Sequence, residues 1–429
     1  MFRGSRFQGL WRHPDFLKLW TGQTISVFGS YISGFAIPII AVITLDASPL
    51  TIALLSAVGM APGFLLGLIA GAWIDRLRRR PILIATDLGR ATILVTIPIA
   101  AAFDALTIPH LVIAAFATSV LSTFFDLAYR SYLPSLVRSD QLLEGNSKLQ
   151  ASASAGEVSG FALAGALIQL FTAPVAILVD VVSFLASALS LSRIRTAEER
   201  HAVDADQEDG GTLPEIRAGL RFIVREPTLR VLVIAAGFFE FSRAMVGAVI
   251  IVFVARDLDL APALIGVVFG VGGISALIGA VFAERFIARR GMGPALITAL
   301  AISALAILFL PLAAGPIAVV LACLVAQQLL GDGFATIHEI GHVSLVQGLT
   351  PARLQGRANG AARSLEWGAA LLGLLLGGVL AEIIGIRPTL VLAALGCLIA
   401  PLLLARSPIR RLRHMPEPDG APGYASPRG

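Results

Sequence analysis

Charged residues and cysteines are scarce in this sequence, and each shortage excludes a class of protein. Charged side chains make up 14% of the 429 residues, whereas an average soluble domain contains about 25%. The two cysteines, Cys323 and Cys397, lie in separate apolar segments and lack the spacing of metal ligands. No Gly-x-x-x-x-Gly-Lys-Ser/Thr motif for nucleotide phosphates occurs. These shortages argue against an ordinary soluble enzyme and against an activity driven by nucleotide hydrolysis, and we predict neither a cofactor nor a bound metal.

Long apolar runs are the main feature that the sequence does contain. Hydrophobic residues account for 56% of the chain, and an apolar run of about 18 residues is long enough to cross a bilayer as a helix. Twelve runs meet this criterion, so we predict an all-α membrane protein with twelve transmembrane helices. The predicted spans are 17–43, 50–73, 81–103, 111–133, 149–171, 175–194, 229–254, 264–283, 294–312, 317–340, 365–386 and 388–404.

The distribution of lysine and arginine predicts the orientation of these spans. Basic residues in short loops are retained on the cytoplasmic side of a membrane. With a cytoplasmic N-terminus, Arg256 and Arg387 are the basic residues that fall in external loops, and Arg90 and Arg243 lie within spans. We therefore predict a multi-pass protein of the bacterial inner (plasma) membrane with both termini in the cytoplasm. A net charge of +5 lacks the basic, aromatic-rich face of a nucleic-acid-binding protein, so no nucleic-acid partner is expected.

An acidic, apolar-poor segment at 196–214 divides the spans into two groups of six. Such a segment buries too little apolar surface to fold, so we predict a flexible linker. A short basic amphipathic helix on the inner leaflet should follow it. The predicted parts are a cytoplasmic N-terminal segment (1–16), a six-helix bundle (17–194), the cytoplasmic linker with the amphipathic helix (195–228), a second six-helix bundle (229–405) and a disordered cytoplasmic tail (406–429).

The two halves also share a pattern of small and polar residues. An asparagine is followed by glycines 14 and 19 positions later at equivalent places in spans five and eleven. Transporters built from repeated bundles show this kind of internal similarity. The matched residues are Asn146, Gly160 and Gly165 in the first half and Asn359, Gly373 and Gly378 in the second.

The loop between spans two and three reads Gly71-Ala-Trp-Ile-Asp75-Arg76-Leu-Arg78-Arg79-Arg80. It resembles the signature of the major facilitator superfamily, Gly-x-x-x-Asp-Arg-x-Gly-Arg-Arg, with Arg78 in place of the loop glycine. The resemblance implies the major facilitator fold, and it implies that Gly71, Asp75, Arg76 and Arg79 form a conformational gate. An arginine run of this kind also serves as a plain positive-inside anchor.

Three further segments resemble the drug:proton antiporter branch of the superfamily, which holds macrolide efflux pumps and the enterobactin exporter. They are 16–29, which contains Gln23, the exit of span four at 125–134 with Asn146, and 349–359. Glycines 156, 160 and 165 resemble the antiporter motif of exporters, although Phe161 stands where that motif has proline. Small residues for helix packing explain these glycines equally well.

Span ten contains His338-Glu339-Ile-Gly-His342, which matches the pattern of zinc proteases. A catalytic zinc needs a third protein ligand, and only a carboxylate such as Asp332 or Glu366 could supply it here. An intramembrane metalloprotease is therefore a remote alternative. Helical phase offers another interpretation, because six polar residues of this span fall within an arc of about 140° at about 100° per residue. A polar stripe of this width should line a cavity rather than face lipid. The stripe consists of Gln327, Gln328, Asp332, His338, Glu339 and His342.

Ionisable residues within spans are costly and therefore candidates for function. Three carboxylates have an arginine three or four positions away on the same helix face; the pairs are Asp87 with Arg90, Asp126 with Arg130, and Glu240 with Arg243. Glu157, Asp180, Asp332 and Glu366 have no such neighbour within a predicted span. An unpaired buried carboxyl takes up a proton more readily than a paired one, so the sequence favours Asp332 as the proton carrier.

These features predict a secondary active transporter that exports a small molecule of the drug, macrolide or siderophore type by proton antiport and alternating access. A proton-coupled importer of a sugar or metabolite is the main alternative, because the fold serves both directions. The expected partners are the substrate, protons and the lipid bilayer, and we expect a monomer. The proton-coupling candidates are Asp332, Asp126, Glu240 and Glu339, and the substrate-cavity candidates are Gln23, Arg130, Arg243, Gln328, His338, His342 and Glu366.

Overall fold

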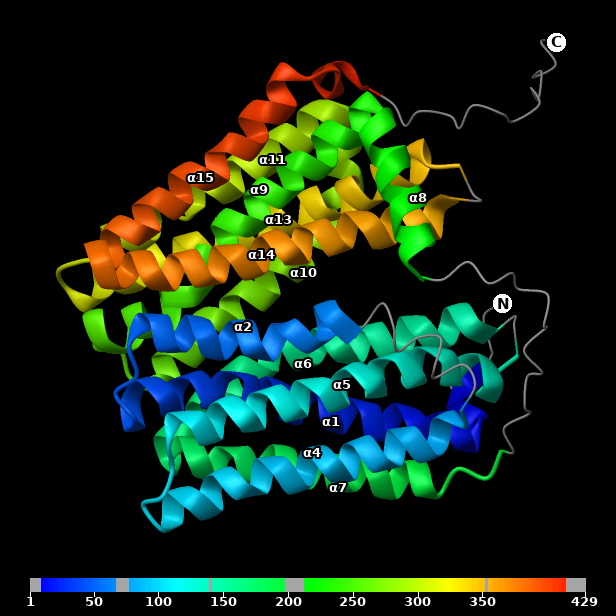
Figure 1. The fold of residues 1–429 in the computed structure, drawn as a ribbon, viewed down its shortest axis with the longest axis vertical. Coiled ribbons are helices and arrows are strands. Elements are labelled where there is room, and N and C mark those ends of the chain that lie inside the picture. Colours follow the sequence, from blue (N-terminus) through cyan, green and yellow to red (C-terminus); the bar gives the residue numbers. More distant parts are fainter. Residues whose placement is uncertain (1–8, 67–76, 139–140, 197–211, 352–353, 414–429) are drawn as a thin grey trace, which may run out of the picture.

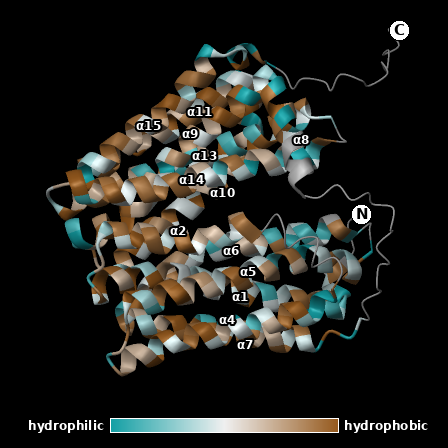
Figure 2. Cartoon of the chain, in the orientation of Figure 1, coloured by the Kyte–Doolittle hydropathy of each residue, from teal (hydrophilic) through white to brown (hydrophobic). Residues whose placement is uncertain are grey.

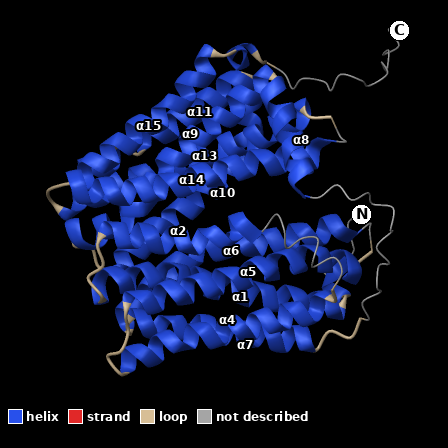
Figure 3. Cartoon of the chain, viewed as in Figure 1, coloured by secondary structure: helices blue, strands red, loops and turns tan. Residues whose placement is uncertain are grey.

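The protein is helical throughout the part that the structure describes (Figure 3). The computed structural model describes residues 9–66, 77–138, 141–196, 212–351 and 354–413. Twelve helices within these ranges are long and apolar enough to cross a membrane, which confirms the twelve predicted spans. Hydrophobic residues dominate the middle of the helices in Figure 2. An all-helical chain suits a bilayer because a helix satisfies its backbone hydrogen bonds internally.

The helices form two bundles, and the first is followed by the second along the sequence (Figure 1). Within the first, α1 packs against α6 and α7, and within the second, α9 packs against α14 and α15. The first bundle comprises α1 (Pro14–Ile39), α2 (Pro49–Leu66), α4 (Arg79–Ala102), α5 (Ile108–Leu136), α6 (Leu142–Leu170) and α7 (Ala173–Ser192). The second comprises α9 (Pro227–Val252), α10 (Pro262–Arg290), α11 (Met292–Ala306) with the short α12 (Phe309–Leu312), α13 (Ile317–Leu349), α14 (Gln355–Ile384) and α15 (Ile386–Arg406).

Proline and cap residues set several helix starts. α1, α7, α9 and α10 each have proline in the first turn, where the missing N–H costs no hydrogen bond. The side chain of His13 accepts a hydrogen bond from the Phe16 amide, and Thr172 accepts one from the Val175 amide. These signals place α1 three residues earlier than the predicted span, at Pro14.

The two bundles repeat each other in backbone detail. α1 continues into a π-helical turn (Ile40–Thr44), and α9 continues into an equivalent one (Phe253–Asp257). An aspartate with positive φ follows each turn, Asp46 at 50° and Asp259 at 48°, and a proline starts the next helix three residues later. The spacing between these two aspartates equals that between Asn146 and Asn359. The structure therefore supports the internal repeat.

The prediction of a disordered tail from residue 406 is wrong for its first part. A 3₁₀ turn (Pro408–Arg411) follows α15, and Ile409 is fully buried. The amide of Gly293 donates to the Leu412 carbonyl at 2.8 Å. Gly293 lies directly against the backbone of Ile409, so glycine at this position allows the close approach. Residues 414–429 lie outside the described part.

A helix follows the predicted linker, as expected. This helix, α8 (Thr212–Arg225), packs against α14. Ile223 is buried in a cluster with Val233, Ala361 and Ala362. The contact of α8 with the inner leaflet stays a prediction. The linker boundary at 228 is two residues late, because α9 begins at Pro227.

Candidate functional site

The polar stripe of span ten lines a cavity, as its helical phase predicts. All six residues of the stripe, on α13, lie in the wall of a cavity of about 620 Å³. α9 contributes Glu240 and Arg243, and α14 contributes Glu366. Glu157 and Phe161 reach the same cavity from α6 of the other bundle. The cavity therefore lies where the two bundles meet.

Acidic groups outnumber basic ones in this wall. The lining contains five carboxylates and two arginines. The guanidinium of Arg243 lies 2.8 Å from the Glu240 carboxylate, as the spacing on the helix predicts. The pair thus neutralises itself and leaves four carboxylates facing one arginine. These are Glu157, Asp332, Glu339 and Glu366, with Arg363.

Asp332 has no ion-pair partner among the described residues. Arg243, which could reach it from α9, instead donates two hydrogen bonds to Glu240, at 3.3 and 2.8 Å. The charges of Arg243 and Glu157 still act on Asp332 across the cavity. A side chain at Gly272 of α10 would collide with the Asp332 carboxylate and with Gln328, so this glycine makes room for both. The geometry keeps Asp332 the candidate that the sequence favoured.

The histidine motif is divided between two different contacts. Nδ1 of His338 lies 3.1 Å from the Leu296 carbonyl oxygen. Nε2 of His342 lies 3.4 Å from Oε1 of Glu366, so the expectation that Glu366 is unpaired is wrong. The sequence did not predict the His342–Glu366 pair, because the two residues lie on different helices, α13 and α14. Among the described residues there is no group of three or more His, Cys, Asp or Glu side chains placed to hold a metal ion.

Three predicted residues of the N-terminal half lie in a separate hollow. Gln23, Asp126 and Arg130 line a hollow of about 1310 Å³, together with residues at the start of α6 and Leu277 of α10. The substrate-cavity candidates are therefore divided between two hollows, and α6 and α10, which pack against each other, contribute residues to both. Asp126 and Arg130 form no ion pair within the described chain, although the charges of Arg130 and Arg90 both act on Asp126.

The ion pair of Asp87 and Arg90 forms as predicted but lies outside both hollows. The Arg90 guanidinium lies between the rings of Phe125 and Phe184, 4.3 and 4.1 Å from their centroids. Asp180, also buried, accepts a hydrogen bond from Ser183 at 2.9 Å. The group is completely enclosed by the first bundle, which favours a structural role.

Of the predicted gate, Arg79 is the first residue of α4. Gly71, Asp75 and Arg76 lie outside the described residues, so their role stays a prediction.

The structure reveals a set of contacts that sequence reasoning missed, at the end of the bundles opposite α8. Arg256 lies 2.7 Å from the Asp46 carboxylate and donates to the Val42 carbonyl at 2.6 Å. Ser48 donates to Glu382 at 2.5 Å. Both contacts join one bundle to the other. The repeated Leu-Asp-x-x-Pro sequence after spans one and seven was the available signal.

Glycines allow the bundles to touch at the same end. A side chain at Gly266 of α10 would meet the Phe161 carbonyl oxygen and would lie 3.0 Å from the Cα of Gly165, both on α6. Gln169 of α6 accepts a hydrogen bond from the Ala263 amide at 3.2 Å. In Figure 1 the bundles converge at this end and diverge toward the end that carries the N-terminus and α8.

Two bacterial proteins are similar over nearly the whole chain. An uncharacterized MFS-type transporter, YfiS of Bacillus subtilis (strain 168), is 27% identical over 395 residues, which cover 89% of this chain and 90% of that protein. The multidrug efflux pump Tap of Mycolicibacterium fortuitum is 27% identical over 417 residues, covering 94% of this chain and 97% of Tap.

Solved structures share the fold at lower identity. The nucleoside transporter NupG has a TM-score of 0.74 at 12% identity, over 92% of this chain and 98% of that one. A bacterial homologue of the iron transporter ferroportin is 19% identical in two states. Its inward-facing state has a TM-score of 0.73 over 93% of this chain and 99% of that one, and its outward-facing state 0.56 over 91% and 98%.

The family described as transmembrane secretion effector matches residues 7–421. This match, the similarity to the related transporters and the twelve helices in two six-helix bundles all indicate a transporter of the major facilitator superfamily. The chain therefore belongs to the transmembrane secretion effector family of the major facilitator superfamily, and it is a membrane transporter rather than an enzyme.

Proposed function

We propose that this transporter exports small organic cations by proton antiport through alternating access. The observation that carries the proposal is the acidic cavity between the bundles, where Asp332 has no ion-pair partner among the described residues. A carboxylate in a low-dielectric cavity attracts either a proton or a cationic ligand. Competition between the two for the same group couples proton entry to substrate exit. Membership of a transporter family removes the metalloprotease as a rival.

The charge of the cavity favours a cation over an anion as substrate. Carboxylates exceed arginines even after the Glu240–Arg243 pair is set aside. A catecholate siderophore carries negative charge and would be repelled there, whereas an amine-bearing drug would be attracted. Phe161, Phe239, Phe269 and Trp367 add aromatic surface to the wall, which suits a cation with an apolar body. The similarity to the multidrug efflux pump Tap supports export of a drug-type molecule.

One carboxylate offers a test of this substrate class. Glu339 lies in the cavity wall and is exposed, so Glu339→Gln should weaken binding of a cationic dye about fivefold, since an exposed charge pair contributes up to about 1 kcal/mol. A neutral dye of similar size should bind unchanged. Fluorescence titration of purified protein measures both. Glu284→Gln, which removes a carboxylate outside the cavity, is the control, and equal loss for both dyes would contradict a cationic substrate.

The contacts between bundles support a conformation open on the cytoplasmic side. Arg256 and Glu382 hold the bundles together at the end opposite α8, and the inward-facing ferroportin homologue is the more similar of its two states. The distribution of basic residues predicts that the α8 end lies in the cytoplasm. Transport would then require the external contacts to break while the cytoplasmic ends close, a rocking motion typical of this architecture.

Topology can be measured independently of transport. A reporter fused after Gly210 should be cytoplasmic, and a reporter fused after Ala314 should be external, because basic residues are retained inside. Alkaline phosphatase and green fluorescent protein fusions distinguish the two sides. The reverse result at either position would overturn the proposed orientation of the closed end.

The direction of transport distinguishes the proposed export from the alternative function, which is import of a sugar or metabolite. Inverted membrane vesicles with an acidic interior should accumulate a cationic dye if the protein is an antiporter that exports. Right-side-out vesicles that accumulate a neutral sugar along an inward proton gradient would favour the importer instead.

A further inference from the structure

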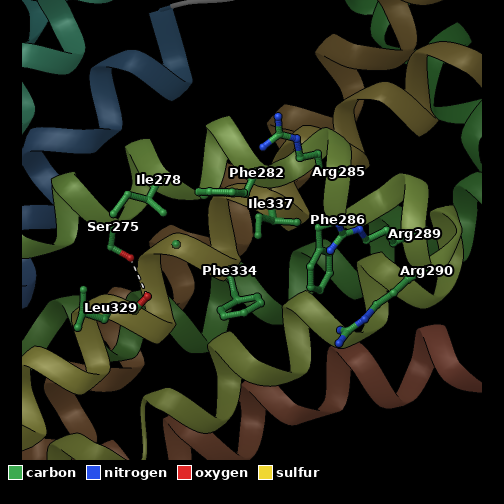
Figure 4. A pocket seen from close by; sticks show the side chains of 12 residues that line it. Ser275, Ile278, Phe282, Arg285, Phe286, Arg289, Arg290, Leu329, Phe334 and Ile337 are labelled. Carbon is green, nitrogen blue, oxygen red and sulfur yellow. Dashed lines mark hydrogen bonds between the residues drawn. The ribbon is translucent and has the colours of Figure 1, made fainter.

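A groove on the outside of the second bundle has a composition unlike that of the central cavity. It lies between α10 and α13 and has a volume of about 500 Å³. At one end, Ser275 donates to the Leu329 carbonyl at 2.7 Å, and next to this contact Gly279 lies directly against the backbone of Gly333. The helices touch at these small residues, and the groove extends from there toward the C-terminus of α10 (Figure 4).

The walls of this groove are apolar, and its end near the C-terminus of α10 is basic. Ile278 and Phe282 of α10 are each 49% exposed, and Phe334 packs edge-on against Phe286 with ring centroids 5.7 Å apart. Three arginines line the half of the groove toward the C-terminus of α10 in Figure 4, namely Arg285, Arg289 and Arg290. The groove therefore joins a hydrocarbon-like surface to a cationic one.

Helical phase places the groove on the lipid side of both helices. At about 100° per residue, the groove residues of α10 centre on the face opposite Gly266, Gly270 and Gly273, which contact α6 of the other bundle. On α13, the groove residues occupy the face opposite the polar stripe of the central cavity. A substrate in the central cavity would not touch this groove.

The arginines form no ion pair with any acidic side chain in the described part of the chain. Arg290 lies over the ring of Phe286, 4.5 Å from its centroid, and all three side chains are exposed. Unpaired arginines above an apolar surface at the end of a transmembrane helix attract anionic headgroups, and the arginine fork matches phosphate oxygens. The complementary ligand carries an acyl chain and a phosphate.

We propose that this groove binds an anionic phospholipid, with an acyl chain along Ile278, Phe282 and Phe334 and the headgroup phosphate held by Arg285, Arg289 and Arg290. The arginines lie at the end that the distribution of basic residues places in the cytoplasm, so the lipid comes from the inner leaflet. The site rests on the shape and charge of the groove and is independent of the substrate and direction proposed above.

Native mass spectrometry of the purified full-length protein with defined lipids tests the site. Wild type should retain phosphatidylglycerol more strongly than phosphatidylethanolamine. The triple variant Arg285→Gln, Arg289→Gln, Arg290→Gln should bind phosphatidylglycerol about 100-fold more weakly, since each basic residue facing an anionic lipid contributes roughly a factor of five. The triple variant Arg406→Gln, Arg410→Gln, Arg411→Gln removes the same charge from exposed positions at the end of α15 and in the turn after it, and should bind like wild type.

A groove-filling variant distinguishes a phospholipid from a free phosphate. Ile278→Trp should fill the apolar part and reduce phosphatidylglycerol binding while all three arginines remain. Elution as a monodisperse peak in size-exclusion chromatography confirms that each variant is folded. Equal retention of both lipids by wild type, or equal loss in the two arginine triples, would overturn the proposal. Full binding by Ile278→Trp together with displacement of the lipid by inorganic phosphate would show a phosphate site without an acyl-chain groove.

Discussion

Asp332→Asn is expected to abolish accumulation against a gradient while substrate binding persists. In the proposed mechanism Asp332 carries the proton, and an amide cannot take one up. For one proton per substrate and no membrane potential, a pH gradient of one unit supports about a tenfold concentration ratio across the membrane. We expect wild type in proteoliposomes to approach this ratio for a cationic dye, and the variant to reach a ratio of about one.

The controls separate loss of coupling from loss of fold. Asp332→Asn should still bind a cationic fluorescent dye, although more weakly, and should still exchange substrate downhill, because the amide keeps the shape of the side chain and the carboxylates of Glu157, Glu339 and Glu366 remain in the wall. Asp104→Asn, which changes an exposed carboxylate between α4 and α5, should transport like wild type. Uphill transport at the normal rate by Asp332→Asn would refute the assignment. Asp126, Glu240 and Glu339 would then be tested as amides in the same assay.

Gly266→Ala is expected to reduce transport by at least about fivefold by opening the closed end of the bundles. The new methyl group would meet the Phe161 carbonyl oxygen and the backbone of Gly165. Neither backbone can move without separating α6 from α10. Overpacking of this kind costs about 1–3 kcal/mol, which shifts a two-state equilibrium about 5- to 150-fold away from the state that is overpacked.

Accessibility of a cysteine reports the shift directly. Ala162→Cys, between α6 and α10, should react faster with a membrane-impermeant maleimide added outside when Gly266→Ala is present. The measurement uses a background with Cys323→Ser and Cys397→Ala. Gly34→Ala is the matched control, because no atom lies within 4 Å of its added methyl group. Unchanged labelling and unchanged transport in Gly266→Ala would show that this contact does not close the external end.

The sequence by itself determined the twelve spans, their division into two groups of six and the polar stripe of α13. These follow from local rules, because lipid requires each span to be apolar and helical, and a polar stripe at helical spacing must avoid lipid. The Glu240–Arg243 pair belongs to the same class, since residues three positions apart on a helix are neighbours wherever the helix lies.

Only the tertiary structure decided which ionisable side chains meet across helices. Glu366 pairs with His342, Arg256 pairs with Asp46, and Arg243 leaves Asp332 without an ion pair among the described residues. Each outcome depends on side chains from different helices approaching within about 4 Å, and their separation along the chain carries no information about that distance. The placement of Asp126 and Asp332 in two different hollows also depends on the tertiary structure, because Asp126 lies on α5 of the first bundle and Asp332 on α13 of the second.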